Sequence, residues 1–226
     1  MTTFQVIDFL GDRILLLPER AVFLESASTL LLSDVHLGKA ETFQSFGIPI
    51  PNLINQSILG RLQKLCLQHS PKRLIILGDL FHSARGLVNE VVDQWQGFLE
   101  SNPIQVQFLL GNHDRRFTKR LEAMGIECVT AAISLNSFIL SHEPEDFTKQ
   151  DPQASPSQLN ICGHLHPCIR LKSRLETLRL PCFYFDRPNH QLVLPSFGDF
   201  TGGYEVSLKL GAIAYAIVEE SVIPFS

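Results

Sequence analysis

Short apolar runs recur along the chain, and polar side chains follow each of them at once. Runs of this length that end in polar residues predict buried strands leading into loops. Five such runs cover residues 30–32, 74–77, 106–110, 138–140 and 161–162. Each is followed within two residues by an aspartate, an asparagine or a histidine. Because functional groups in α/β sheets gather beyond the carboxyl ends of the strands, these five strand ends predict one shared site.

Between the first strands, three segments have apolar residues at spacings of three and four, as one face of a helix does. The predicted helices cover residues 53–68, 89–100 and 116–124. Pro103 follows the second and Gly125 the third, where each of these residues would end a helix. Strand and helix therefore alternate through the first half of the chain.

From Arg179 onward the pattern becomes typical of β structure, with apolar runs at residues 182–185, 191–197 and 212–218 separated by turn signals. An α/β half followed by a β-rich half predicts two packed sheets flanked by helices. Residues 143–158 are rich in proline and polar residues and predict an exposed loop between two strands. Since the chain has no repeat and no linker between two cores, we expect a single domain over residues 1–226.

Composition supports a globular protein, because 226 residues with 45% hydrophobic and 19% charged content can bury a substantial core. No apolar run approaches the roughly 18 residues that a membrane-spanning helix needs, so we expect no membrane association. The net charge of −4 gives no broad basic face for nucleic acid. Bound cations can nevertheless dominate the field of a small site. The five cysteines form no CxxC pair and predict buried thiols in a reducing compartment, so we expect a cytoplasmic protein.

The first two chemical motifs are Asp34-Val35-His36 and Gly78-Asp79-Leu80-Phe81-His82. In an extended segment residues i and i+2 point the same way, so Asp34 and His36 should converge on one point. Asp79 follows a buried strand directly, where an ionised carboxylate needs a cation as its partner. Either motif alone has an ordinary alternative: a chance tripeptide for the first, a helix N-cap for the second.

Three further motifs follow in order: Gly111-Asn112-His113-Asp114, Ser141-His142 and Gly163-His164-Leu165-His166. Asn112 offers an amide oxygen, and His164 and His166 put two imidazoles on one side of an extended stretch. A surface turn, or a lone structural histidine, would explain each motif by itself. Their joint order, each after an apolar strand, favours a metal site.

The order D-x-H, G-D, G-N-H-D, H and G-H-x-H resembles the signature of the calcineurin-like metallophosphoesterases. That resemblance implies a four-layer αββα sandwich with two mixed sheets flanked by helices. A narrower resemblance lies in LLPERAVFL, HLGKAETFQSFGIPIP, LRLPCFYF and LPSFGDFTGG. These four segments are similar to the bacterial ligase-associated DNA damage response endonucleases, which are implied to act beside a DNA ligase and a helicase. None of the four carries an obvious catalytic group.

The resemblance implies two divalent metal ions, with Asp79 bridging them and a bridging water or hydroxide as the nucleophile. Mn²⁺ is the expected metal, and iron or zinc would also suit nitrogen and oxygen ligands. The implied ligands of one ion are Asp34, His36, Asp79 and His166, and those of the other are Asp79, Asn112, His142 and His164. His113 corresponds to the general acid, with Asp114 holding its ring. The implied substrate contact is His82, and Lys39, Arg85 and Arg115 are close enough in sequence to reach a phosphate, although solvated surface charge is the ordinary state of such residues.

Three functions remain open on the sequence. The first is a phosphodiesterase or endonuclease acting on nucleic acid, in DNA repair on single-stranded or flapped DNA. The second is a phosphoesterase for a small nucleotide, a cyclic nucleotide or another phospho-compound. The third is a catalytically silent scaffold, which would require lost ligands, and no ligand is lost here. The oligomeric state, and the choice between DNA and RNA, are left open as well.

Overall fold

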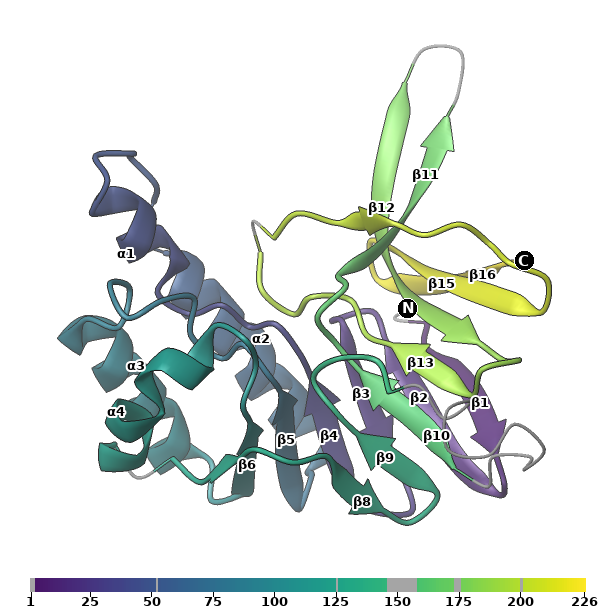
Figure 1. The fold of residues 1–226 in the computed structure, drawn as a ribbon, viewed down its shortest axis with the longest axis horizontal. Coiled ribbons are helices and arrows are strands. Elements are labelled where there is room, and N and C mark those ends of the chain that lie inside the picture. The colour runs from purple at the N-terminus through teal and green to yellow at the C-terminus, as the bar shows by residue number, and fades with distance from the viewer. Residues whose placement is uncertain (1–2, 52, 125, 146–157, 173–175, 200) are drawn as a thin grey trace.

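The computed structural model describes residues 3–51, 53–124, 126–145, 158–172, 176–199 and 201–226. In these residues two mixed β-sheets pack against each other, and helices cover the outer face of the first sheet (Figure 1). The predicted fold class of two mixed sheets with flanking helices is therefore confirmed.

The first sheet combines an antiparallel half with a parallel half. In spatial order its strands are β1 (Gln5–Phe9), β2 (Asp12–Leu17), β3 (Ala21–Leu24), β4 (Thr29–Leu32), β5 (Arg73–Leu77), β6 (Gln105–Leu109) and β7 (Cys128–Val129). Hairpins connect β1 to β2, β2 to β3 and β3 to β4. Crossover connections then place β5 parallel to β4 and β6 parallel to β5. A crossover of this kind needs a helix on the sheet face.

The helices of the described residues all precede Met124. They are α1 (Lys39–Gln44), α2 (Ile54–His69), α3 (Asn89–Ser101), the short 3₁₀ helix η1 (Asp114–Phe117) and α4 (Thr118–Ala123). The first two predicted helices agree with α2 and α3 to within one residue, whereas the third is divided into η1 and α4. Helix α1 was not predicted, because its six residues are too few for an apolar period to emerge. None of these helices is long and apolar enough to cross a membrane.

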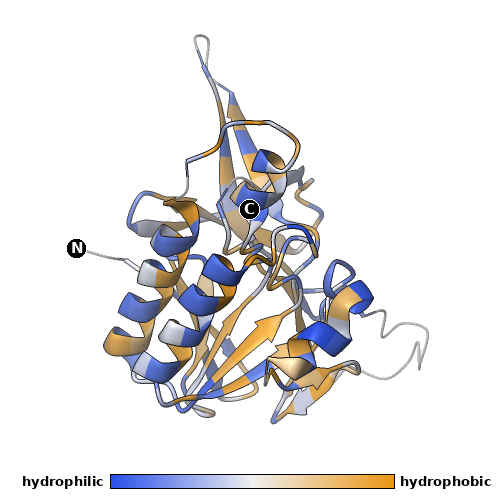
Figure 2. Ribbon diagram, turned by 90° about the vertical axis from the view of Figure 1, so that its left-hand side faces the viewer, coloured by the Kyte–Doolittle hydropathy of each residue, from blue (hydrophilic) through white to orange (hydrophobic). Residues whose placement is uncertain are grey.

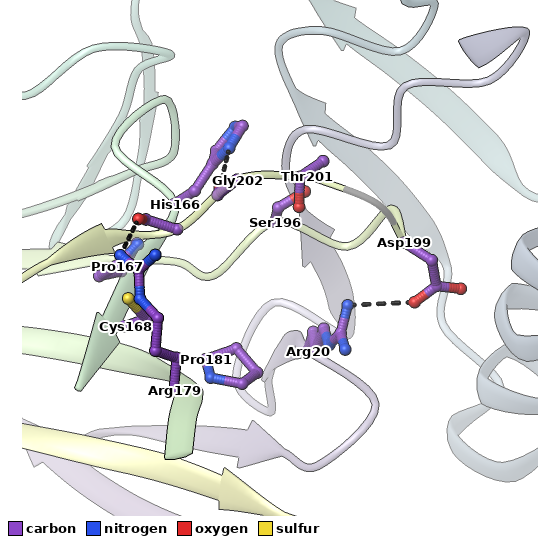
Figure 3. Close-up of a pocket in the computed structure, with 11 residues that line it drawn as sticks. Arg20, His166, Pro167, Cys168, Arg179, Pro181, Ser196, Asp199, Thr201 and Gly202 are labelled. Carbon is purple, nitrogen blue, oxygen red and sulfur yellow. Dashed lines mark hydrogen bonds and ion pairs between the residues drawn. The ribbon is translucent and has the colours of Figure 1, made fainter. Parts of the chain in front are cut away.

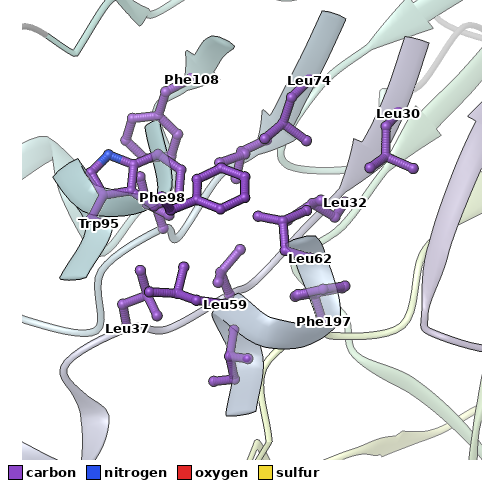
Figure 4. Packing of buried hydrophobic residues seen from close by; sticks show 14 of the residues in the cluster. Leu30, Leu32, Leu37, Leu59, Leu62, Leu74, Trp95, Phe98, Phe108 and Phe197 are labelled. Carbon is purple, nitrogen blue, oxygen red and sulfur yellow. The ribbon is translucent and has the colours of Figure 1, made fainter. Parts of the chain in front are cut away.

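The helices bury their apolar stripes against one face of the first sheet. Leu62 of α2 and Trp95 and Phe98 of α3 pack with Leu30 and Leu32 of β4 (Figure 4). Full burial of one such side chain contributes about 1.5 to 3 kcal/mol to folding. The helices keep polar residues on their outward faces, and the strands behind them are hydrophobic (Figure 2).

The second sheet holds β8 (Ile133–Leu135), β9 (Phe138–Leu140), β10 (Leu159–Cys162), β11 (Pro167–Lys172), β12 (Thr177–Asp186), β13 (Gln191–Val193), β14 (Tyr204–Glu205), β15 (Ala212–Val218) and β16 (Ser221–Phe225). Strands β9, β10 and β13 run parallel, and the others are mainly antiparallel. The hairpin of β11 and β12 projects beyond the body of the molecule (Figure 1).

A second core fills the space between the sheets. Leu31 of β4 and Ile75 of β5 point to this side, opposite to their neighbours in sequence, and meet Phe138 and Ile161 of the second sheet. The two-residue period of a strand thus gives the first sheet two buried faces. This explains why its strands read as continuous apolar runs.

The outer face of the second sheet carries no helix in the described part of the chain. Val206 lies there instead and packs against Tyr184, Ala212 and Ala214. The predicted helix end at Gly125 and most of the predicted loop of residues 143–158 lie outside the described residues.

Candidate metal centre

The five predicted strand ends meet at one edge of the two sheets. β4, β5 and β6 are parallel neighbours in the first sheet, and β9 and β10 are parallel neighbours in the second. Backbone bonds join the loops that follow them: Asp34 N donates to Gly78 O at 3.1 Å and His36 N donates to Asp79 O at 2.9 Å. The loops therefore lie side by side, as the crevice rule for such sheets requires.

Left-handed backbone, and not the extended backbone that we expected, makes the motif side chains converge. The φ angles of Asp34, His36, Asp79, His164 and His166 lie between 48° and 68°. Residues with a Cβ seldom adopt this conformation, and where they do it costs on the order of 1 to 3 kcal/mol each. The predicted convergence occurs, but its assumed geometry was wrong for both Asp34-Val35-His36 and the segment from His164 to His166.

Two motif glycines make room for the site. Gly78 has a φ of 88°, and a Cβ at this position would collide with the ring of His142. A Cβ on Gly111 would collide with the carboxylate of Asp79. The glycines before Asp79 and Asn112 are thus required by the close approach of side chains from neighbouring loops.

The first candidate metal group consists of Asp34, His36 and His166, whose possible ligand atoms lie within 4.8 Å of one another. Asp34 is fully buried, and its Oδ1 accepts no hydrogen bond although it lies 3.1 Å from Nε2 of His166. His166 Nδ1 lies 3.1 Å from the carbonyl oxygen of Gly202, to which it donates its proton. Nε2 of the neutral ring then carries a lone pair that faces a carboxylate oxygen. Two acceptors at this distance need a proton or a metal cation between them.

The second candidate group contains Asp34, Asp79 and His142, again within 4.8 Å. His142 Nδ1 lies 2.9 Å from the carbonyl oxygen of Leu77 and donates to it, so Nε2 is the free acceptor. That Nε2 lies 2.9 Å from Oδ1 of Asn112 and 3.1 Å from Nδ1 of His164. Acceptor atoms therefore face one another at a second point, and nitrogen and oxygen ligands of this kind suit divalent transition metals.

Charge and burial shift the pKa values of the metal-facing groups in different directions. Burial lowers the pKa of the His36 imidazole to about 2, so the ring is neutral at pH 7. Burial alone would raise the pKa of the Asp34 carboxyl, but His166 outweighs it and holds this pKa below its ordinary value. Burial raises the pKa of Asp79, whose Oδ1 accepts the backbone N–H of His113 at 3.0 Å. Both carboxylates are nearly inaccessible to water, which makes a bound cation the natural partner for their charge.

His113 and His82 form a pair of stacked rings beside the first group. Their ring centroids are 5.4 Å apart, and His113 Nδ1 donates to the carbonyl oxygen of His82 at 3.0 Å. This bond leaves Nε2 of His113 as the free ring nitrogen, on a side chain that is 41% exposed. His82 lies 3.4 Å from His36, Nδ1 to Nδ1, and burial, followed by Lys39, lowers its pKa to about 4. A partly exposed imidazole whose Nε2 lies 3.9 Å from Oδ2 of Asp79 is placed as a proton donor to substrate needs to be.

Asp114 does not hold the ring of His113, which corrects the expectation. Its fully buried carboxylate instead accepts the backbone N–H groups of Phe81 and Gly111, each at 3.3 Å. Burial, and then the charge of Asp79, raise the pKa of Asp114 to about 8. Asp114 therefore ties two metal-site loops together through their backbones, and it is also the first residue of η1.

The three basic residues named as candidates for a phosphate contact lie in different surroundings. Lys39 is close enough to lower the pKa of His36 and His82, so its charge acts at the site. The Arg85 guanidinium lies over the ring of Phe46, 4.7 Å from its centroid. Arg115 lines a cavity of about 260 Å³ on the His142 side of the centre.

The sequence motifs did not reveal the backbone carbonyls that orient the imidazoles. Those of Leu77, His82 and Gly202 each accept an Nδ1–H and so aim an Nε2 at the centre. A backbone carbonyl has no side-chain identity, so no residue pattern could have indicated them.

Buried carboxylates, four convergent imidazoles and the partly exposed His113 side chain define a centre of the class found in metal-dependent hydrolases of phosphoesters. Residues 27–157 match the calcineurin-like phosphoesterase family over more than half of the chain. The protein belongs to that family, whose members use divalent metals, and it is a hydrolase acting on phosphoester bonds.

The chain is also similar in fold to a solved nuclease, over nearly the whole length of both proteins. The chain is 29% identical to the nuclease MPE of Pseudomonas putida, with a TM-score of 0.78 over 99% of this chain and 100% of that one. This similarity agrees with the narrower resemblance to DNA damage response endonucleases. No curated protein matches the sequence.

Proposed function

We propose that the protein is a metal-dependent endonuclease that hydrolyses phosphodiester bonds of DNA, single-stranded or flapped, in DNA repair. The observation that carries the proposal is the meeting of lone pairs at two points, with Nε2 of the partly exposed His113 side chain 3.9 Å from Oδ2 of Asp79. The full-length similarity to a nuclease supports nucleic acid as the substrate class.

Seven side chains would hold two divalent ions: Asp34, His36, Asp79 and His166 the first, and Asp79, Asn112, His142 and His164 the second. When bound, the ions supply Lewis-acid polarisation of a phosphoryl oxygen and lower the pKa of water. Nitrogen and oxygen ligands with no thiolate suit manganese, iron or zinc, and Mn²⁺ is our choice because of the family resemblance.

His113 is the proton donor in this proposal. The His82 carbonyl holds the Nδ1–H, so Nε2 is the nitrogen that can carry a second proton toward the substrate. Protonated Nε2 donates to the oxygen of the departing sugar hydroxyl, which is a poor leaving group and gains most from a general acid. Asp114 is a positioning residue, because it acts through the loop backbones.

His82 and Lys39 are our choice of substrate contacts, because His82 lies 3.4 Å from His36, Nδ1 to Nδ1, and the charge of Lys39 lowers the pKa of His36. Arg85 and Arg115 stay candidates for contacts farther along a strand. We further propose that the protein works in the cytoplasm, in functional association with a ligase and a helicase. Its five free cysteines suit a reducing compartment.

The test is cleavage of a circular single-stranded DNA by the Mn²⁺-treated protein. A circle has no ends, so its linearisation requires endonuclease action. The matched control is His113→Ala purified in the same way, which keeps the proposed ligands and loses the acid. Duplex DNA, RNA, cyclic nucleotides and phosphomonoesters are assayed beside the circle.

Two results decide between the candidate functions. Linearisation by the wild type that is abolished by a chelator supports the endonuclease. An intact circle together with rapid turnover of a cyclic nucleotide or a phosphomonoester would replace it with the small-molecule phosphoesterase.

A further inference from the structure

Three sequence segments without an assigned role line one cavity of about 330 Å³ beside the metal centre (Figure 3). They are parts of LLPERAVFL, LRLPCFYF and LPSFGDFTGG, which lie far apart in the chain. His166, a proposed metal ligand, lines the same cavity. The lining residues used below are Arg20, Arg179, Pro181, Asp199, Gly202 and Gly203.

Arg20 reaches the cavity from the turn between β2 and β3. Its Nη1 donates to Oδ1 of Asp199 at 3.2 Å and to the carbonyl oxygen of Gly198 at 3.3 Å. Its backbone is left-handed, with a φ of 68°, a conformation that residues with a Cβ seldom adopt. The two bonds hold the guanidinium, and the Arg20 side chain is only 27% exposed.

The charge around Arg20 is not balanced. Arg61 also binds Oδ1 of Asp199, at 3.4 Å, so two guanidinium groups share one carboxylate. Arg61 stacks over the ring of Phe197, 4.6 Å from its centroid, and lies outside the cavity lining. Burial lowers the pKa of Arg20, and the charge of Arg61 lowers it further. An incoming anion would relieve this excess of positive charge.

Arg179 supplies a second guanidinium from β12, with Pro181 between it and Arg20 (Figure 3). Its Nη2 donates to the carbonyl oxygen of Gly203 at 2.7 Å. In the described residues the bonds of Arg20 use only Nη1 and the bond of Arg179 uses only Nη2, so each keeps N–H donors for a ligand. Asp199 is shared by Arg20 and Arg61, and Glu205 binds Arg170 and is also acted on by the charge of Arg179, so guanidinium groups outnumber carboxylates around the cavity.

We propose that this cavity binds a phosphate of the substrate strand that flanks the cleaved phosphate, with Arg20 and Arg179 as donors. The inference rests on the proposed nuclease function. The ring of His166 connects the two places, because Nε2 faces Asp34 in the metal centre while Nδ1 binds Gly202 in the cavity wall. Planar guanidinium groups suit phosphate oxygens through paired N–H donors.

Arg179→Ala is the main test, because Arg179 is exposed and its loss should not disturb folding. We expect KM for a single-stranded oligonucleotide to rise about 3- to 10-fold with little change in kcat, since the contact binds the ground state and transition state alike. The dependence of log KM on log salt should become shallower by about 0.7, the share of one single-strand phosphate. Arg20→Ala should act in the same direction, but it also releases Asp199.

Arg13→Ala is the matched control. Arg13 lies at the opposite end of β2 from Arg20, is similarly exposed, and pairs with Glu25 at 2.7 Å. Bis-p-nitrophenyl phosphate, which has no flanking phosphate, is the comparison substrate. Arg179→Ala should raise KM several-fold more for the oligonucleotide than for this small diester. Arg13→Ala should have the same effect on KM for both substrates.

A second measurement identifies the phosphate. Oligonucleotides with one neutral methylphosphonate linkage are cleaved by the wild type and by Arg179→Ala. At one flanking position, the methylphosphonate should weaken cleavage by the wild type and cause no further loss of cleavage by Arg179→Ala. Equal KM values for Arg179→Ala and Arg13→Ala would overturn the inference even if DNA is cleaved. The inference would also fail if each methylphosphonate position weakened cleavage by Arg179→Ala as much as cleavage by the wild type. A protein that hydrolyses only small phosphoesters would overturn the proposed function, and the flanking-phosphate inference with it.

Discussion

Replacing Asp34 by asparagine should make the metal-free protein more stable and the metal-loaded protein less so. Oδ1 of Asp34 is fully buried, has no hydrogen-bond donor and faces Nε2 of His166 at 3.1 Å. An amide nitrogen at that position would donate to Nε2. The other oxygen would still accept the backbone N–H of His164, now at 2.9 Å. The substitution thus turns a contact between two acceptors into a hydrogen bond and removes a buried charge.

The magnitude follows from these contacts. One gained hydrogen bond contributes about 1 kcal/mol, and relief of the unpaired charge adds on the order of 1 kcal/mol. For a chain of this size, that sum raises the Tm of metal-free protein by about 4 to 8 °C. In the wild type, Mn²⁺ at about 100 times its Kd should add about 2.7 kcal/mol, or about 5 to 10 °C. Because Asp34 is a proposed ligand of the first ion, and its carboxylate also lies within 4.8 Å of the Asp79 and His142 ligand atoms, the variant should lose a large part of that shift.

The assay is thermal unfolding after treatment with a chelator, at about pH 9, where imidazoles are neutral. Burial lowers the pKa of His166, but Asp34 outweighs it and the net pKa is raised. Protonation of His166 therefore stabilises the wild type below that pKa, and the stabilisation is lost as pH rises through it. The advantage of the variant should accordingly shrink in acid.

Asp186→Asn is the control for this experiment. Asp186 is buried too, but its oxygens accept Asn189 N at 3.3 Å and Asn189 Nδ2 at 2.9 Å. Its substitution should destabilise the protein by about 1 kcal/mol and leave the Mn²⁺ shift unchanged. If Asp34→Asn lowers the metal-free Tm as Asp186→Asn does, and keeps the Mn²⁺ shift, then the carboxylate is structural and the metal assignment fails.

Three further predictions use other assays. His113→Ala should lower kcat about 10²- to 10⁴-fold for a sugar leaving group and much less for p-nitrophenol, while the Mn²⁺ shift in Tm stays; equal losses on both substrates would remove His113 from the acid role. Gly78→Ala should abolish the Mn²⁺-induced rise in Tm, because a Cβ at this position collides with the ring of His142. As its control, Gly60→Ala has open space around the added Cβ in α2 and should raise Tm by the equivalent of about 0.5 to 1 kcal/mol. Burial raises the pKa of the Cys66 and Cys128 thiols to about 11, so at about pH 8 iodoacetamide should label native protein far more slowly than unfolded protein by mass spectrometry; equal rates would show that these thiols are accessible.

The residue pattern predicted the strands and the place where they end because both depend on side-chain chemistry. Leu30 and Leu32 face the helices and Leu31 faces the second sheet, so a strand with two buried faces leaves an unbroken apolar run. A polar residue after such a run marks the end of burial. The helices α2 and α3 were found for the same reason, since Trp95 and Phe98 repeat at the helical period.

The backbone geometry of the site could not be predicted in this way. Asp34 and His36 were expected to converge through extended backbone, yet both are left-handed. Asp114 was expected to hold the ring of His113, yet its carboxylate binds backbone N–H groups. In each case the deciding partner is a main-chain group from another loop, such as the carbonyl of His82 or the N–H of Phe81. Main-chain groups are the same in every residue, and only the fold brings the right ones together.

For the same reason, the sequence predicts the class of reaction better than it predicts the residues that contact the substrate. A metal centre needs particular ligand types at the ends of particular strands, so a short ordered pattern can predict it. A phosphate subsite needs only guanidinium or ammonium groups at a suitable place, and Arg20 and Arg179 reach theirs from segments about 160 residues apart in a chain whose net charge is −4. Neither arginine follows a motif ligand, whereas Arg85 and Arg115, which do, lie against Phe46 and in a different cavity. Substrate contacts in this fold are therefore to be sought by following the cavity beside His166, and not by following the chain from each ligand.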